Sequence, residues 1–446
     1  MQKLQIHNFR QIGDATVEVA RYLLLIGEQA SGKSTLAKLI YFFKSLPQDY
    51  LAILYASQNG NIRTIKSQFI KKIQDKFNQY FGMTSRLADD FWIKYYYDMD
   101  SESYILLSKT PRLNITFASD YWNRISEDTK TCINQIQRSE LPVSGTSFAI
   151  QEKRKNSVLQ QLRTLTCQLF FDANESMFFP AGRNITVSYP EQFQYLFYGV
   201  LDKTSDDKKT ESNTIDLTLM KEFVGYSKLL IDYFASQPRF IDQSTEFGKI
   251  VARKVFEILH GKYNNDSGFE KIKYEENGYV PLKLSSSGQQ ECIRIIQDMV
   301  YIYSQGIHAS RIIEESETHL YPTAQKLLVE LMALIFNKTN GQVVLTTHSP
   351  FILSSFNNLL FYNKVLLSDS QKAMELAAHF GVENLHGENE RLDVAPKDFR
   401  AYALKPGCGE YCKSIFDNET QLIGENYIDE ATENIYADFD FLYNLI

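Results

Sequence analysis

The sequence predicts an α/β fold with an N-terminal antiparallel β lobe, a mainly parallel central sheet and a large helical insertion. Two apolar runs, 22–26 and 342–347, are typical of strands buried on both faces of a parallel sheet. Alternating apolar residues before position 20 indicate half-buried antiparallel strands. Between the two runs, segments such as 157–170 and 217–234 repeat apolar residues at intervals of three and four, which is helical spacing.

Length and composition are those of a globular protein. The chain has 446 residues, of which 44% are hydrophobic and 23% are charged. This length fits two or three domains, or one α/β domain with a long insertion, and we expect the insertion. The expected parts are an N-terminal lobe at 1–120, a mainly helical insertion at 121–260, a C-terminal lobe at 261–365 and a docking or regulatory segment at 366–446.

Charge, cysteine usage and hydropathy exclude several classes of protein. The formal net charge of -7 argues against a general nucleic-acid coat, because non-specific phosphate binding needs a net basic face. The five cysteines form no even, closely spaced framework, as expected in a reducing compartment. Cys408 and Cys412 lack a nearby His or Cys pair, so two ordinary residues are favoured over half a zinc site. No apolar run approaches the ~18 residues of a membrane span and no signal pattern opens the chain, so we expect a cytoplasmic protein.

Local patterns place the elements of the N-terminal half. Apolar residues alternate over 4–9 and again over 15–19, which predicts a small antiparallel sheet. Similar alternation at 104–107 and 113–117 predicts a hairpin, with its turn at 109–112. The polar stretch 202–213 has no apolar anchors, and we expect an exposed loop there.

The first chemical motif fits the phosphate-binding P-loop and lies between a buried strand and an apolar-periodic helix. Its residues are Gly27, Glu28, Gln29, Ala30, Ser31, Gly32, Lys33 and Ser34, with Thr35 following in the helix. Gly27 and Gly32 allow backbone N–H groups to wrap around phosphates, and the helix that starts near Lys33 directs its positive dipole end at them. We expect Lys33 to reach the outer phosphates of a nucleotide and Ser34 to bind Mg²⁺.

The second motif is the Ser-rich segment 284–291, which opens another apolar-periodic helix. Ser oxygens commonly cap helices, so this segment alone would be interpreted as an ordinary cap. Hydroxyl groups and free N–H groups at a helix N-terminus also form an anion site, suited to a γ-phosphate presented from outside. The presence of a P-loop in the same chain favours the second interpretation.

The third motif follows a short β-branched run and begins with Glu314 and Glu315 at a presumed strand tip. Ligands bind at such tips in open parallel sheets. Glu314 is placed to order the shell of Mg²⁺, and Glu315 to orient and polarise an attacking water. The alternative is a solvated acidic turn, because most acidic runs are no more than that.

The fourth motif follows a predicted helix at 323–336 and the buried strand at 342–347. Ser349 is a helix cap and Pro350 is the first residue of the next helix. His348 is thereby left at the end of a central strand, where its imidazole could donate a hydrogen bond to a γ-phosphate.

These four motifs, in this order, resemble those of ABC-type ATPases, and the chain is nearest to the stand-alone branch related to RecF and to overcoming-lysogenisation-defect proteins. The resemblance runs from the N-terminus through Leu353 and includes the segments 8–10 and 179–183. It implies a P-loop ABC-type ATPase head that uses ATP and Mg²⁺. In such proteins the Ser-rich signature of one subunit touches the γ-phosphate held by the other, so Ser286 and Gly288 are implied to act across a homodimer.

The resemblance also assigns roles to single residues. It makes Glu314 the Walker B acid, Glu315 the catalytic base, His348 the switch histidine and Arg10 a nucleotide contact, with Arg183 a weaker candidate for the same contact. Two positions depart from the common pattern: Glu314 stands where many ABC proteins have Asp, and Ser287 stands where transporters have Gly. The longer Glu314 side chain requires the Mg²⁺ shell to shift or the strand to lie deeper.

The biological role is left with three alternatives. Proteins of this branch commonly serve in bacterial anti-phage defence, so the favoured one is an ATP-hydrolysing sensor or scaffold that controls a separately encoded effector. The second is a DNA-repair clamp with a basic face made of Lys66, Lys71, Lys72 and Lys76. The third is an ATP-gated assembly module with little turnover. An intrinsic nuclease is not expected, because the acidic pair in 438–440 has helix-like surroundings and no strand-borne Glu precedes it.

Overall fold

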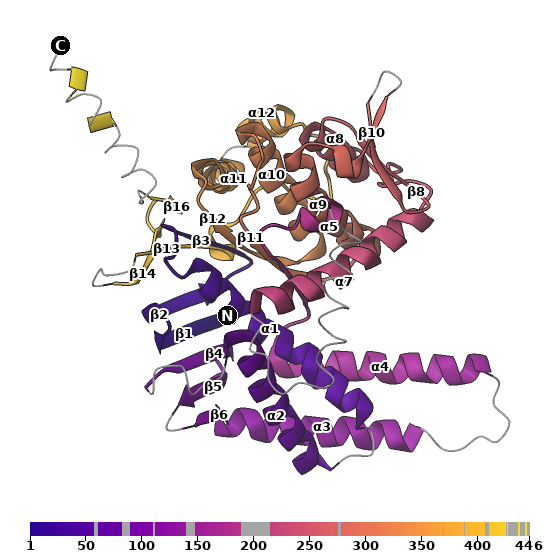
Figure 1. Cartoon of the computed structure of the whole chain (residues 1–446), viewed down its shortest axis with the longest axis vertical. Helices are drawn as coiled ribbons and strands as arrows, with labels where there is room; N and C mark the ends of the chain where they lie inside the picture. Colours follow the sequence, from indigo (N-terminus) through magenta and orange to yellow (C-terminus); the bar gives the residue numbers. More distant parts are fainter. Residues whose placement is uncertain are drawn as a thin grey trace. The chain divides into compact units, whose positions relative to one another are not determined.

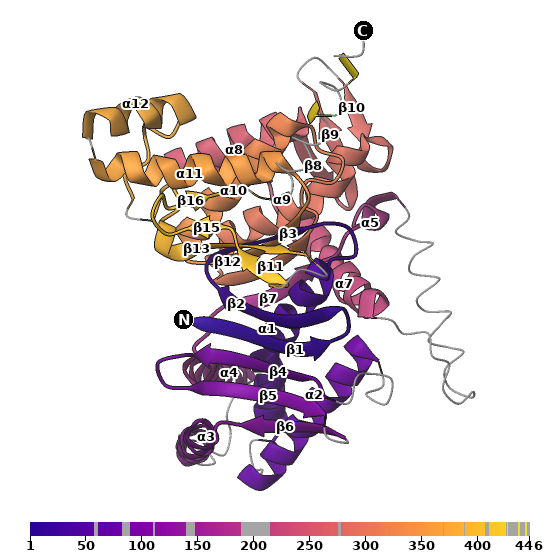
Figure 2. The ribbon, with the colours of Figure 1, turned by 90° about the vertical axis from the view of Figure 1, so that its left-hand side faces the viewer.

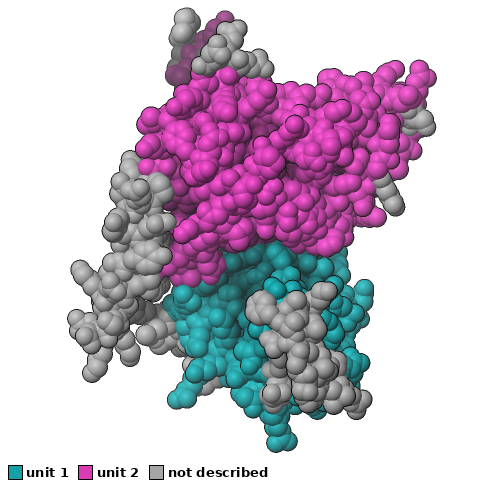
Figure 3. All heavy atoms as spheres, turned by 90° about the vertical axis from the view of Figure 1, so that its right-hand side faces the viewer, with its two compact units in different colours: residues 1–19, 38–176, 406–411 teal, residues 20–37, 177–405, 412–446 magenta. Residues whose placement is uncertain are grey.

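The computed structural model describes residues 1–57, 61–82, 90–109, 112–139, 148–188, 215–274, 278–368, 370–387, 389–405, 410–424, 426, 436–437 and 442–443. The chain divides into two compact units (Figure 3). Unit 1 comprises residues 1–19, 38–176 and 406–411, and unit 2 comprises residues 20–37, 177–405 and 412–446. The predicted loop at 202–213, Cys408 and the acidic pair in 438–440 lie outside the described residues. Among the described residues, no helix is both long and apolar enough to cross a membrane.

Unit 1 is built on an antiparallel sheet of strand order β2-β1-β4-β5-β6 (Figure 2). Its strands are β1 (Gln2–Phe9), β2 (Ile12–Val19), β4 (Trp92–Asp98), β5 (Ser103–Lys109) and β6 (Leu113–Phe117). The alternation of apolar residues in the sequence matches the alternation of buried side chains along these strands, because successive side chains point to opposite faces. The predicted N-terminal sheet and the predicted hairpin are therefore confirmed.

The helices of unit 1 carry an aromatic core. They are α2 (Ile62–Phe81), α3 (Ser119–Ser139), α4 (Phe148–Phe170) and the part of α1 (Lys33–Ala56) from Lys38 onward. Helices α3 and α4 lie side by side (Figure 1). Phe42, Phe77 and Phe81 pack against one another at ring distances of 5.0 to 6.1 Å. One buried ion pair, between Lys44 and Asp172, lies in this core with its two side chains 1% and 2% exposed.

Unit 2 is built on a six-stranded sheet of order β14-β13-β3-β12-β11-β7. Its strands are β3 (Tyr22–Gly27), β7 (Glu175–Phe179), β11 (Ala309–Glu314), β12 (Gln342–Thr347), β13 (Phe399–Leu404) and β14 (Cys412–Ser414). Strand β3 runs parallel to both β12 and β13, and β12 runs parallel to β11. The two apolar runs of the sequence are β3 and β12, with every side chain of 22–26 and 342–347 buried, which confirms the predicted parallel sheet.

Helices cover this sheet, and α10 and α11 lie on one face of it (Figure 2). The helices of unit 2 are α5 (Ile185–Ser188), α7 (Ile215–Ser236), α8 (Glu246–Leu259), α9 (Ser287–Gln305), α10 (Pro322–Thr339), α11 (Pro350–Ser368) and α12 (Ser370–Phe380). A three-stranded antiparallel sheet consists of β8 (Lys262–Asp266), β9 (Phe269–Lys273) and β10 (Tyr279–Pro281), and a two-stranded one of β15 (Phe416–Asp417) and β16 (Leu422–Ile423). The α/β fold class with a mainly parallel central sheet is confirmed.

Three strands of the central sheet, β7, β13 and β14, were not predicted. Strand β7 interrupts the expected helical insertion, and β13 arises in the expected C-terminal segment and pairs with β3. Strands β7 and β14 are short, and a short apolar run does not by itself distinguish a strand from a turn of buried helix. Strands β7 and β13 pair with β11 and β3. Their partners lie far away in the sequence, so local pattern alone could not place them.

Candidate functional site

The sheet of unit 2 brings three of the predicted motifs to one edge. The P-loop follows β3, Glu315 follows β11 and His348 follows β12, and these are adjacent parallel strands. In the register of the sheet, Glu314 pairs with Thr346 and Thr347 pairs with Ile26. The carboxyl-terminal ends of all three strands therefore lie side by side, and this is where open parallel sheets bind ligands.

The P-loop adopts a conformation that requires glycine at its first position. Gly27 has φ +154°, and a Cβ there would lie 2.5 Å from the Leu404 carbonyl oxygen and 2.7 Å from Ser31 Oγ. Gly32 has φ +91° and Ala30 has φ +61°. Such alternation of backbone conformation turns successive N–H groups toward a common centre, which suits an anion.

The P-loop encloses the ammonium group of Lys33. Its Nζ donates to the carbonyl oxygens of Gly27 at 2.8 Å and Glu28 at 2.7 Å, and lies 3.4 Å from Ser31 Oγ. Burial lowers the pKa of Lys33 to about 8, although the carboxylates of Glu315 and Glu317 oppose this shift. The Lys33 ammonium thus lies at the N-terminus of α1, and the three hydrogen-bond partners of its Nζ include no carboxylate. Its charge is therefore available to bind a phosphate.

Glu315 and His348 face each other beside this cation. The distance from His348 Nε2 to Glu315 Oε1 is 3.8 Å, and both side chains are less than half exposed. Burial, followed by the charge of Lys33, lowers the pKa of His348 below its usual value, so the imidazole is neutral at pH 7. Glu315 lies in the left-handed region with φ +44°, and its N–H donates to the Thr346 carbonyl at 3.0 Å. A carboxylate and a neutral imidazole are therefore placed together at the end of the sheet.

Glu317 is a part of this site that the sequence analysis did not assign. Its Oε1 accepts hydrogen bonds from Thr347 Oγ1 at 2.6 Å and from the His348 N–H at 2.8 Å. It therefore fixes the backbone that presents His348. Its position three residues after Glu314, in an acidic run already singled out, was the available signal.

Glu314 is buried at the tip of β11, and its Oε2 accepts a hydrogen bond from the Ala181 N–H at 3.3 Å. Ser34 is exposed in the first turn of α1, and Thr35 beside it is buried. Among the described residues, no group of three or more His, Cys, Asp or Glu side chains could hold a metal ion. A protein-only metal cage is therefore absent from the described part of the chain.

The Ser-rich motif forms the exposed start of α9. Ser286 caps this helix, with its Oγ accepting from the Gln289 N–H at 3.3 Å and the Gln289 side chain accepting from the Ser286 N–H at 3.1 Å. Ser286 and Ser287 are exposed, whereas Gly288 is buried. A Cβ on Gly288 would lie 2.7 Å from the His319 carbonyl oxygen, so the close packing of this turn requires glycine. The predicted cap and the exposed hydroxyl groups are both present.

Arg10 belongs to unit 1, where its Nη2 donates to the Phe81 carbonyl at 2.9 Å and its guanidinium lies 5.4 Å from the Phe81 ring centre. Its contact with a nucleotide stays a prediction. Arg183 follows β7 in unit 2 and is fully buried. Its guanidinium donates to backbone carbonyls, among them those of Glu314 at 2.7 Å and Glu315 at 2.8 Å.

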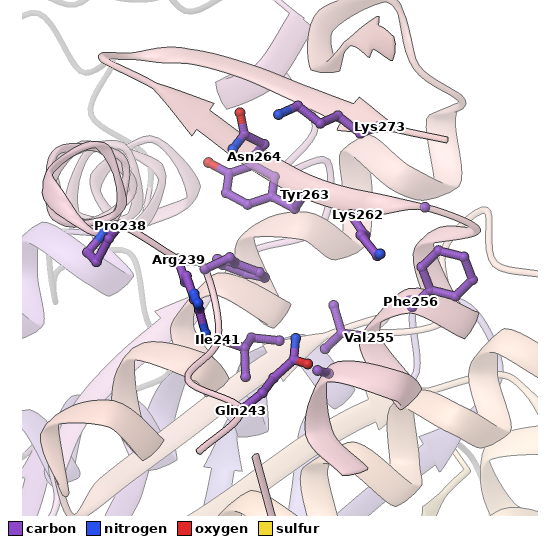
Figure 4. Close-up of a pocket in the computed structure, with 13 residues that line it drawn as sticks. Pro238, Arg239, Ile241, Gln243, Val255, Phe256, Lys262, Tyr263, Asn264 and Lys273 are labelled. Carbon is purple, nitrogen blue, oxygen red and sulfur yellow. The ribbon is translucent and has the colours of Figure 1, made fainter. Parts of the chain in front are cut away.

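A separate pocket of about 290 Å³ lies in unit 2 between α8, β8 and the segment that joins α7 to α8 (Figure 4). Figure 4 shows Arg239, Gln243 and Lys262 around it, with the ring of Tyr263 on its wall. None of the residues of the four motifs lines this pocket. The residues gathered at the strand ends therefore lie outside this cavity.

A P-loop at the end of a central parallel strand, with acidic residues at the end of a nearby strand of the same sheet, is the arrangement of a P-loop ATPase. The model of the AAA ATPase domain family matches residues 1–353, so the chain belongs to this family and is an ATPase. A comparison with curated proteins gives no match.

Solved structures of SMC heads are among those similar to this chain. The SMC head bound to the C-winged helix domain of ScpA has 11% identity and a TM-score of 0.37, with 79% of this chain and 90% of that chain covered. The SMC head domain from Thermotoga maritima has 10% identity and a TM-score of 0.34, with 79% and 90% covered. A third head, with an extended coiled coil and bound to a ScpA domain derived from Pyrococcus furiosus, has 13% identity and a TM-score of 0.31, with 80% and 92% covered.

Proposed function

We propose that two copies of this protein close head to tail around two ATP molecules and hydrolyse them. The observation that carries the proposal is the meeting of Lys33, Glu315 and His348 at the ends of adjacent parallel strands, together with an exposed α9 N-terminus. The first three groups bind the γ-phosphate and orient the water that attacks it, and the α9 N-terminus supplies a second anion site for the ATP held by the partner copy.

Exposed apolar side chains support a second copy at this edge. Leu284 is 70% exposed, Tyr321 74% and Phe351 47%. Leu284 is the first residue of the Ser-rich motif, Tyr321 lies six residues after Glu315, and Phe351 lies three residues after His348. Large apolar groups left in water beside polar motifs are typical of a surface that a partner covers.

The residues of the site divide the work of hydrolysis between them. The Lys33 ammonium neutralises charge on the outer phosphates, and the N–H groups of the P-loop orient them. The Glu315 carboxylate accepts a hydrogen bond from the attacking water and orients it. The neutral imidazole of His348 donates a hydrogen bond to the γ-phosphate.

The site also fits Mg²⁺. This ion usually binds through one or two protein oxygens together with phosphate oxygens and water, so it needs no protein cage. Ser34 and Glu314 are the side chains that would hold it, and it would neutralise charge on the phosphates. The Glu314 carboxylate already accepts a hydrogen bond from the Ala181 N–H, which fixes its orientation despite the additional methylene.

The setting follows from the resemblance to the RecF and overcoming-lysogenisation-defect branch. On that ground we propose that the ATPase acts as a sensor or scaffold in the cytoplasm during bacterial anti-phage defence and controls a separately encoded effector. ATP-driven closure of two copies would create the surface on which the effector binds or from which it is released.

The structure gives little support to a DNA clamp built on the four lysines of α2. Lys72 and Lys76 both pair with Asp49, at 3.6 and 2.6 Å, and Lys66 lies 4.5 Å from the ring centre of Trp122. Three of the four cations thus have intramolecular partners, which would compete with phosphate contacts. A hydrolysing dimer is accordingly preferred over a DNA clamp. Measurement of the ATP hydrolysis rate distinguishes this dimer from an assembly module with little turnover.

Mass measurement of the full chain tests the proposal. The Glu315→Gln variant in ATP and magnesium is expected to have the mass of a dimer or a larger assembly, and the wild type to turn ATP over. A monomeric Glu315→Gln variant at saturating ATP would overturn the head-to-tail arrangement. Dimers without turnover in the wild type would leave the assembly module as the function.

A further inference from the structure

Arg183 is a buried cation that contacts the end of β11, where Glu314 and Glu315 lie. Its side chain is 0% exposed and lies in the turn after β7. The guanidinium donates to four backbone carbonyls: Nε to Glu291 at 3.1 Å, Nη1 to Pro180 at 3.1 Å and Glu314 at 2.7 Å, and Nη2 to Glu315 at 2.8 Å. It also lies 3.6 Å from the carboxylate of Glu291. One planar group therefore joins α9, β11 and the turn after β7.

The contacts with β11 act on the catalytic carboxylate. Arg183 binds the carbonyl oxygens of Glu314 and Glu315, which belong to the peptides before and after the α-carbon of Glu315. The φ of +44° at Glu315 is a strained conformation for a residue with a side chain. Two charge-assisted hydrogen bonds at this point hold the backbone in place. The direction of the Glu315 side chain, which the attacking water needs, depends on that backbone.

The contacts with α9 act on the Ser-rich motif. Glu291 lies in the first turns of α9, and it contacts Arg183 through its carbonyl and its carboxylate. The segment that follows Arg183 contacts α9 a second time, because Ser188 Oγ in α5 donates to Gln290 Oε1 at 2.5 Å. Gln290 in turn donates to the Ser285 carbonyl at 3.0 Å, directly before the cap. The start of α9 is thus braced from the Arg183 turn.

We propose that Arg183 is a positioning residue that couples the two ATP sites of the dimer. This inference rests on the proposed head-to-tail function. In that arrangement Glu315 acts on the ATP of its own subunit, while the start of α9 in the same subunit acts on the ATP of the partner. A displacement of either element moves the guanidinium that holds the other, so closure of α9 on one ATP aligns Glu315 for the second.

Lysine cannot replace this arginine. The guanidinium is a rigid planar fork with five donors, and its contacts here require donors pointing in several directions in one plane. An ammonium keeps the charge opposite Glu291 but loses simultaneous contact with both β11 carbonyls. Arg183→Lys therefore separates the fork geometry from the charge.

Two measurements on the full chain test the coupling. In the Glu315→Gln background, Arg183→Lys is expected to raise the dissociation constant of the ATP-held dimer about tenfold, because the start of α9 is loosened. In the otherwise wild-type chain, Arg183→Lys is expected to lower kcat about tenfold at protein concentrations that keep the dimer assembled. Binding of a fluorescent ATP analogue to the monomer is expected to stay unchanged, since none of the four carbonyl partners of Arg183 belongs to the P-loop.

A matched control removes a different buried cation from unit 2. Lys254 pairs with Glu330, with the two side chains 4% and 3% exposed, and links α8 to α10. Lys254→Gln is expected to lower the melting temperature without changing kcat or the dimer constant. If Arg183→Lys is too unstable to purify, Glu291→Gln weakens the same bridge from α9 and is expected to change both quantities in the same direction.

The inference is overturned if only one of the two quantities changes, or if both change equally in Lys254→Gln. Failure of the proposed function has a different result: the Glu315→Gln parent with Arg183 intact then stays monomeric in ATP. The parent and the Arg183 variant thus report on the two proposals separately.

Discussion

Glu315 and His348 come from different strands, yet Nε2 of the histidine lies 3.8 Å from Oε1 of the carboxylate. The parallel pairing of β11 with β12 produces this proximity, since it brings the residues that follow the two strands to the same edge. Glu317 fixes the turn that carries His348, and Arg183 fixes the backbone that carries Glu315. The position of the candidate base is therefore set by the sheet and by two flanking side chains.

Replacement of Glu315 by Gln is expected to lower the ATPase rate by about 100-fold or more, because a neutral amide cannot accept a proton from water. Steady-state phosphate release measures the effect. The same substitution at Glu257, an exposed residue on α8, is the matched control and is expected to leave the rate unchanged. Equal rates for Glu315→Gln and the wild type would remove Glu315 from the mechanism.

ATP binding is expected to take up a proton above pH 8. Burial lowers the pKa of Lys33 to about 8 in the free protein, so the side chain is charged below this pH and largely neutral above it. Phosphate favours the charged form, and the affinity for ATP should therefore fall by up to about tenfold per pH unit above pH 8. Calorimetric titration in buffers of different ionisation enthalpy measures the uptake.

The Glu315→Gln variant tests whether Lys33 is the group that takes up this proton. The Glu315 carboxylate raises the pKa of Lys33, so Glu315→Gln should move the midpoint of proton uptake to lower pH. An unchanged midpoint, or no uptake at pH 9, would show that Lys33 does not titrate in the way described.

Gly27→Ala is expected to destabilise unit 2 and to weaken ATP binding. The new Cβ would lie 2.5 Å from the Leu404 carbonyl of β13, at a φ of +154° that side chains rarely adopt. A cost of about 1–3 kcal/mol follows from such backbone strain. Gly225→Ala in α7 is the control: no atom lies within 4 Å of its new Cβ, and removal of a glycine from a helix should stabilise by about 0.5–1 kcal/mol. Thermal unfolding with and without ATP distinguishes the two.

Lys44→Met is expected to destabilise the protein by about 3–5 kcal/mol, because it leaves the Asp172 carboxylate buried without its cation. Burial alone would raise the pKa of Asp172, but the Lys44 ammonium lowers it below its usual value. The stabilisation by this pair is thus present above the unfolded pKa of about 4 and is lost as the pH falls through the folded value. Denaturant unfolding at pH 7 and at low pH measures both effects.

The exposed pair of Lys249 with Glu246 is the control for that change, with side chains 55% and 50% exposed. Lys249→Met should cost less than about 1 kcal/mol, because water screens the pair. A similar loss for both variants would show that burial does not decide the strength of the Lys44 pair.

The sequence predicted those parts of the candidate site that are short motifs of consecutive residues directly after a strand. The P-loop, the Glu314–Glu315 pair and His348 each follow a recognisable buried strand, and the sheet then brings them together. Arg183 and Glu317 could not be given their positions in this way, because both act through contacts with backbone groups distant in sequence. Strand β13 escaped prediction for a similar reason, since its pairing with β3 is non-local.

Mixing two inactive variants tests the head-to-tail claim most directly. Lys33→Ala removes the P-loop cation, and Ser287→Glu places a carboxylate at the exposed start of α9, where it stabilises the helix but repels a γ-phosphate. Each variant alone should be inactive, whereas a mixed dimer contains one site with an intact P-loop from one subunit and an intact α9 from the other. Recovery of ATP hydrolysis on mixing is the expected result. A mixture as inactive as its components, or full activity of Ser287→Glu alone, would contradict it.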